Sequence, residues 1–143
     1  MIRAAVLALL SATAIAASAH AACRHIEIAA VVADKAPGAR AVAGLHLARE
    51  PLVASSEVTG AKTVAEGQDN AVLVQFTPAA AARLQAYTGS HVGQRIAVLI
   101  DGYPSLVTEI AGPLGANGLQ ISGDFRAQAV SLADSVNACG KAP

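Results

Sequence analysis

The chain has 143 residues, enough for one domain, and carries ten basic and ten acidic side chains. This balanced charge, without a basic stripe, excludes the electrostatic footprint of a nucleic-acid-binding protein. Beyond the first 21 residues no apolar stretch approaches 18 residues, so the remainder is not expected to span a membrane.

Residues 1–21 have the pattern of an export signal. Arg3 supplies the positive charge, residues 4–17 are apolar and rich in alanine, and Ala19-His20-Ala21 fits the small-x-small rule for cleavage. The apolar stretch is too short to cross a bilayer of about 30 Å comfortably, which favours secretion over anchoring. The alternative is an alanine-rich N-terminal helix of a cytosolic protein, but the missing helix caps and the small-residue site argue against it.

Cleavage would leave a single domain, residues 22–143, with Cys23 and Cys139 near its two ends. In an oxidising compartment an isolated pair of this kind is most simply a disulfide that joins the chain ends. Alternatively, Cys23 is the lipidated cysteine of a bacterial lipoprotein, although His20 stands where such a signal has an aliphatic residue. The spacing rules out a Cys-x-x-Cys redox centre.

The first half of this domain is predicted to consist of strands. Alternating or continuous apolar patterns, separated by turn residues, favour strands at residues 24–32, 44–48, 55–64 and 71–76. Pro51 prevents the second strand from continuing into a central ladder. Gly60 indicates a bulge or bend in the third.

The second half alternates helices with strands. Thr77-Pro78 is a strong helix start, with Thr at the N-cap and Pro at the first helical position, and predicts a helix over residues 78–88. Residues 96–100 form the longest apolar run after the N-terminus and predict a strand buried on both faces. Asp101-Gly102 predicts a hairpin turn, followed by a returning strand at residues 106–110 and a short strand at residues 119–122.

The final segment predicts a second helix that begins after a cap at Ser122 or Asp124 and ends at Gly140. Its apolar residues fall on a single helical face: Phe125, Ala129, Leu132, Ala133 and Val136. This order of elements predicts an α+β fold, a mainly antiparallel sheet with two helices packed on one face.

These patterns resemble a known family, the head subdomain of the first periplasmic domain of SecD, an accessory subunit of the bacterial preprotein translocase. The resemblance covers residues of about 45 to 139. It rests on the order and spacing of several motifs, each weak alone: Leu45-x-Leu-x-x-Glu50-Pro51, Thr77-x-x-Ala-Ala after the strand at 72–76, Thr88 with Gly93, Arg95-Ile-Ala-Val-Leu-Ile-Asp101-Gly102, Ile110 with Pro113, and Gln120-Ile-Ser-Gly-Asp-Phe125 with the helix that follows.

The resemblance implies a non-enzymatic periplasmic domain that binds exported, unfolded polypeptide or an envelope protein. The chain departs from the family pattern in having Thr108 where a proline is usual, and Pro104 instead. The sequence also has no room for the transmembrane helices of SecD or its ferredoxin-like base subdomain. We therefore expect a free-standing secreted head domain that does not use the proton-motive force.

Few residues suggest a catalytic or metal-binding site. Asp101 is best explained as a turn residue and Ser122 as a helix cap, because neither has a catalytic partner in the sequence. His25, His46 and His91 lack the spacing of metal ligands, so neither a metal site nor a cofactor is expected.

An exposed aromatic residue favours an interface, which makes Tyr103 and Pro104 candidate partner contacts at a hairpin tip. The strand at 55–64 is a candidate edge for pairing with an extended peptide.

Two alternatives remain at this point. One is a small ligand-binding protein or hydrolase, which requires a pocket where polar groups such as Asp101, Glu109 and the histidines converge. The other is a structural module held by its disulfide, without a dedicated ligand.

The intact mass of the protein purified from the cell envelope tests the predicted processing. We expect the mass of residues 22–143 minus two hydrogens, because the signal is removed and the two cysteines are bridged. An added lipid mass would instead support the lipoprotein alternative, and an unprocessed mass would contradict export by this signal.

Overall fold

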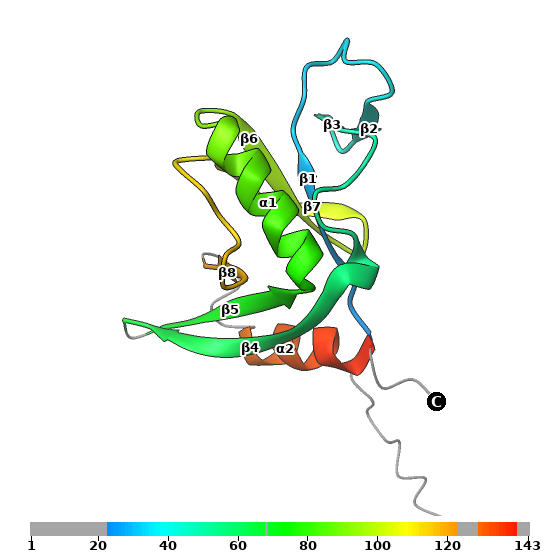
Figure 1. Cartoon of the computed structure of the whole chain (residues 1–143). Coiled ribbons are helices and arrows are strands. Elements are labelled where there is room, and N and C mark those ends of the chain that lie inside the picture. The colour runs from blue at the N-terminus through cyan, green and yellow to red at the C-terminus, as the bar shows by residue number, and fades with distance from the viewer. Residues whose placement is uncertain (1–22, 68, 123–128, 140–143) are drawn as a thin grey trace, which may run out of the picture.

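The computed structural model describes residues 23–67, 69–122 and 129–139 (Figure 1). Their elements, in chain order, are β1 (Ile26–Ala30), β2 (Arg40–Val42), β3 (Leu45–Leu47), the 3₁₀ turn η1 (Ser55–Glu57), β4 (Val58–Glu66), β5 (Asp69–Phe76), α1 (Pro78–Ser90), β6 (Arg95–Ile100), β7 (Tyr103–Glu109), β8 (Leu119–Ile121) and α2 (Ala129–Ala138). Neither helix in these ranges is long and apolar enough to cross a bilayer.

The predicted α+β class, with antiparallel strands and two helices, is confirmed. The strands are divided among three sheets rather than one, in the orders β1-β6-β7, β2-β3 and β4-β5-β8, and all neighbouring strands are antiparallel. Figure 1 shows α2 beside the β4–β5 hairpin, against which it packs. The patterns in the sequence identify strands but not their partners, because pairing joins segments far apart in the chain.

The strand β6 is buried on both faces, as its apolar run predicts. Ile96 and Val98 face the main core, which both three-stranded sheets and both helices share. Ala97 and Leu99 face the opposite way, into a second cluster that Leu47 and Leu45 of the β2–β3 ribbon cover. The ribbon therefore removes from water a face of the sheet that would otherwise be exposed.

The helix α1 begins as predicted and extends two residues further than expected. Thr77 is its N-cap, with the side-chain oxygen accepting a hydrogen bond from the backbone N–H of Ala80 at 3.3 Å, and Pro78 occupies the first turn. Ala80 and Leu84 are fully buried in the main core. Thr88 is buried too, and its hydroxyl donates to the carbonyl oxygen of Leu84.

The hairpin turn at Asp101-Gly102 is confirmed, with positive φ at both residues (53° and 80°), as a type I′ turn requires. The returning strand β7 begins directly after it at Tyr103, three residues earlier than predicted. Pro104 is accommodated within this strand because β7 lies at the edge of its sheet, where a missing N–H is tolerated.

The predicted strand at residues 55–64 is partly a 3₁₀ turn, since η1 occupies Ser55–Glu57 before β4 begins. The ladder is irregular between Val58 and Gly60, in agreement with the bulge expected at this glycine. The outer edge of β4 is closed in its middle, because the side-chain amide of Asn137 on α2 accepts from Ala61 N–H at 2.9 Å and donates to Ala61 C=O at 2.8 Å. The expectation that this strand offers an open edge is therefore wrong at Ala61.

The last helix buries Ala129, Leu132, Ala133 and Val136, four of the five residues predicted for its inner face. Phe125, the predicted cap at Asp124 and the predicted end at Gly140 lie outside the described residues, so the capping role of Ser122 is not tested. A disulfide joins Cys139, directly after α2, to Cys23, three residues before the start of β1.

Among the glycines of the described residues, Gly118 leaves the least room for a side chain. A Cβ atom there would lie 2.4 Å from the carbonyl oxygen of Val74, and φ is +98°. Gly93 has a similar φ of +87° but no atom within 4 Å of its Cβ position, so it is a matched control. We expect Gly118→Ala to lower the free energy of unfolding by about 2 kcal/mol more than Gly93→Ala, measured by urea denaturation. Equal losses would contradict the tight approach to β5.

Reduction of the Cys23–Cys139 disulfide should lower the melting temperature, because the bond closes a loop with a sequence separation of 116 residues. The chain-entropy model gives a stabilisation of about 4 to 5 kcal/mol for a loop of this size. Thermal unfolding with and without a reductant measures the change. The control is the double variant Cys23→Ser/Cys139→Ser, whose melting temperature should not respond to the reductant. An unchanged melting temperature in the wild-type protein would argue against the structural role of the bond.

Candidate functional site

The outer edge of β7 is an open sheet edge among the described residues. In its sheet, β6 lies on one side of β7 and no described strand lies on the other. The opposite edge of the sheet, β1, is paired instead: Ile28 bonds with Leu52 and Val53, and Ala30 accepts from Ala48.

Several backbone groups of β7 point away from the sheet. Arg95 C=O accepts from Val31 beyond β1, so the backbone of its partner Glu109 faces outward from β6. The alternation of an antiparallel ladder gives Val107 the same orientation. Free N–H and C=O groups of this kind can pair with another extended chain.

The edge also carries exposed apolar side chains. Tyr103 is 66% exposed and Val107 is 37% exposed, and both belong to β7. They stand opposite Ile100 and Ala97 of β6, which places them on different faces of the sheet. The sequence predicted Tyr103 and Pro104 as contacts but missed Val107, because a valine in a strand is more often buried than exposed.

A groove lies beside the beginning of β7, between this strand and α2. It has a volume of about 230 Å³, and Tyr103 and Ser105 form one wall. Ser131, Leu132 and Ser135 of α2 form the other. The groove is part apolar and part hydroxyl-lined, so it can accept a small side chain from a strand laid along β7.

Asp101 connects the β6–β7 turn to Arg24 and His25 through its side chain and backbone. Its Oδ1 accepts from the backbone N–H of His25 at 2.9 Å, and its Oδ2 pairs with Arg24 at 3.1 Å. Its own N–H donates to the carbonyl oxygen of His25 at 2.8 Å. These bonds tie the β6–β7 turn to the chain that enters β1, a role that the sequence reading of Asp101 as a turn residue did not include.

The polar residues of the hydrolase alternative are not gathered in one pocket. Asp101 follows β6, whereas Glu109 pairs with Arg95 at the other end of the same strand, about 17 to 20 Å away at the usual rise per residue. His91 stacks on Tyr87 with ring centroids 3.8 Å apart. His46 lies on β3, on the strand ribbon that covers the second cluster.

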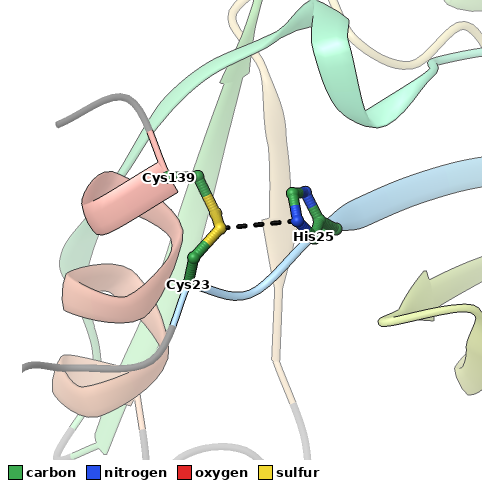
Figure 2. A group of neighbouring side chains, drawn as sticks. All are labelled: Cys23, His25 and Cys139. Atoms are coloured by element: carbon green, nitrogen blue, oxygen red, sulfur yellow. Dashed lines mark hydrogen bonds between the residues drawn. A yellow bond between two sulfur atoms is a disulfide. The ribbon is translucent and has the colours of Figure 1, made fainter. Parts of the chain in front are cut away.

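His25 lies beside the disulfide rather than beside the other histidines. Its Nε2 is 3.5 Å from Sγ of Cys23, and Cys139 completes a group whose ligand-type atoms all lie within 4.8 Å of one another (Figure 2). The sequence did not reveal this group, because Cys139 comes from the other end of the chain. The signal that could have found it is the spacing Cys23-x-His25 combined with the predicted disulfide.

The shifted pKa values belong to groups outside the edge and the groove. Hydrogen bonds from the Arg83 side chain and from the N–H of Ala54 lower the pKa of Glu57, and the same ion pair raises the pKa of Arg83. Burial raises the pKa of Tyr87. Arg83 also donates to Leu52 C=O, so this network fastens α1 to the segment before η1 and is structural.

A family model described as SecDF, P1 head subdomain, matches residues 29–139. Two solved structures of SecDF share 17% identity with the chain. One, "Crystal structure of SecDF in Super-membrane-facing form", has a TM-score of 0.61 over 81% of this chain and 19% of its own. The other, "Structure and function of a membrane component SecDF that enhances protein export", has a TM-score of 0.60 over 83% of this chain and 64% of its own.

The chain therefore spans about a fifth of one SecDF structure and less than two thirds of the other. No curated protein matches it. The resemblance seen in the motifs is confirmed by the family match, which extends it at the N-terminal side to residue 29 and thus into β1. The family is a non-catalytic module of a transport protein, and this chain belongs to it as a SecDF P1 head subdomain.

Proposed function

We propose that the chain is exported to the periplasm, loses residues 1–21, and there binds extended segments of exported polypeptide along β7. Membership in the SecDF P1 head family supports a place in protein export, since SecDF is described as a membrane component that enhances protein export. The observation that supports this proposal most directly is the open β7 edge, on which Tyr103 and Val107 are exposed.

An extended polypeptide suits this edge because the free groups of β7 are backbone amides. A strand added to β7 would satisfy them with its own N–H and C=O groups, whatever its sequence. Exported polypeptides differ in sequence, and main-chain pairing is independent of side chains. Alternate side chains of the added strand would face Tyr103 and the groove on one side and Val107 on the other.

The interaction should be weak and reversible. The edge offers only a few outward backbone groups, since Pro104 has no N–H and the ladder is irregular between Val98 and Leu99. Each backbone hydrogen bond contributes about 1 kcal/mol net, and association itself opposes binding by several kcal/mol. These terms nearly cancel, so a dissociation constant no tighter than about 10 μM is expected. Such an affinity suits a domain that must release each segment.

The β4 edge is a poorer candidate for this role. Asn137 already satisfies both outward backbone groups of Ala61, so an added strand would have to displace two hydrogen bonds. The β7 edge, rather than the β4 edge, is therefore the proposed binding site.

The test is to titrate the protein with a fluorescently labelled unfolded exported polypeptide and to follow anisotropy. Val107→Lys should weaken binding at least about fivefold, because a lysine on an edge strand discourages pairing. Val92→Lys is the matched control, since Val92 is 59% exposed but lies outside β7, and it should change affinity less than about twofold. Tyr103→Ala should also weaken binding.

Two results would contradict the proposal. One is the absence of binding at high micromolar concentrations of the wild-type protein. The other is an equal loss in the Val107→Lys and Val92→Lys variants, which would point to the added charge rather than to the β7 edge. Circular dichroism of all the variants establishes that they are folded.

A further inference from the structure

We propose that Cys23, His25 and Cys139, when the disulfide is reduced, form a site for a thiophilic cation of the Zn²⁺ type. Two thiolates and one imidazole are a common donor set for Zn²⁺, which is bound tetrahedrally by sulfur and nitrogen. The disulfide and the metal would exclude each other, so the site is gated by oxidation. This inference concerns a different surface chemistry from polypeptide binding and does not depend on it.

The distance between sulfur and nitrogen already suits such a cation. Sγ of Cys23 and Nε2 of His25 are 3.5 Å apart. Bonds of about 2.3 Å from Zn²⁺ to sulfur and about 2.05 Å to nitrogen, at a tetrahedral angle, place the two ligand atoms about 3.5 Å apart. The imidazole therefore needs little movement relative to Cys23. The two sulfur atoms must separate to about 3.8 Å, and Sγ of Cys139, which lies within 4.8 Å of both other ligand atoms, must come to about 3.5 Å from the imidazole nitrogen.

Reduction supplies that separation. An external dithiol gives two electrons and two protons to the disulfide, the bond between the sulfur atoms breaks, and the dithiol becomes a disulfide itself. The two thiols of Cys23 and Cys139 then move to van der Waals distance. Zn²⁺ binding displaces their two protons, because the thiolate and not the thiol is the ligand.

In addition to the covalent disulfide, hydrogen bonds hold the segments of the three residues together. Arg24 N–H donates to the carbonyl oxygen of Ser135 at 3.1 Å, which joins the chain before β1 to α2. The backbone N–H of His25 also donates to Oδ1 of Asp101, which fixes His25 to the β6–β7 turn. Neither contact involves a sulfur atom, so breaking the disulfide leaves both in place and the ligands stay near one another without the metal.

The surroundings also favour a cation. Cys139 follows the C-terminal end of α2, where the backbone carbonyl groups carry partial negative charge. Its Sγ lies 3.0 Å from the carbonyl oxygen of Arg24. The guanidinium of Arg24, between the two ligand residues in the sequence, is paired with Asp101. Cys23 and His25 are exposed and Cys139 is half-buried, so a hydrated ion can reach the site and a water molecule can complete the coordination.

The experiment compares Zn²⁺ binding by the oxidised and the reduced protein, with a chromophoric zinc indicator as competitor and a reductant that does not bind zinc. We expect one Zn²⁺ per reduced chain and none per oxidised chain. His25→Ala should weaken binding at least about tenfold, whereas His46→Ala, a control on β3, should leave it unchanged. Cobalt substitution should give a thiolate-to-metal charge-transfer band in the reduced protein only.

If the reduced chain is too unstable for the indicator titration, its thermal unfolding is measured with and without Zn²⁺ instead. Zn²⁺ should raise the melting temperature of the reduced wild-type protein, or restore its circular dichroism, and should do neither for Cys23→Ser/Cys139→Ser. The proposal is overturned if Zn²⁺ binds the oxidised and reduced forms alike, if the reduced form binds none, or if His25→Ala binds as tightly as the wild-type protein.

Discussion

The burial of β6 on both faces is the constraint on which the rest of the fold depends. A strand of five consecutive apolar residues, Ile96 to Ile100, is stable only if water is excluded from both of its sides. The helices and the β4-β5-β8 sheet cover one side, and the small β2–β3 ribbon covers the other. The ribbon thus contributes more to the fold than its six residues suggest, because without it Ala97 and Leu99 would face solvent.

The outer edges of β1, β4 and β7 differ in how far their backbone groups are already paired. The outer side of β1 is paired with the segment around Val53, and β4 is closed at Ala61 by a side-chain amide. Open edges favour aggregation, and proteins usually shorten, charge or distort them. On β7, Pro104 and the irregular ladder limit how much of the edge can pair. This combination permits a short, weak pairing and opposes the extended pairing that leads to aggregates.

Local chemistry allowed much of the fold to be predicted from the sequence. The cap at Thr77, the turn at Asp101-Gly102 and the buried run of β6 each depend on neighbouring residues, and each is confirmed. The division into three sheets and the closure of β4 by Asn137 depend on contacts between distant segments, so the pattern of any one segment could not indicate them. For the candidate site, Tyr103 was found because an exposed aromatic is conspicuous after a turn, whereas Val107 looks like any strand valine.

The junction of the chain ends is linked to the groove beside β7, because the same segments form both. Arg24 lies between Cys23 and His25 in the sequence and also lines the groove, and Ser135, one turn before Cys139, lines it too. Separation of the two sulfur atoms must therefore move residues next to the groove wall or be absorbed by the Arg24–Ser135 hydrogen bond. A backbone hydrogen bond can lengthen or break at a cost of about 1 kcal/mol, whereas the covalent bond holds the two sulfur atoms in contact. The oxidised bond is thus the stronger restraint on the shape of the groove, and the state of the cysteines bears on what the groove can hold.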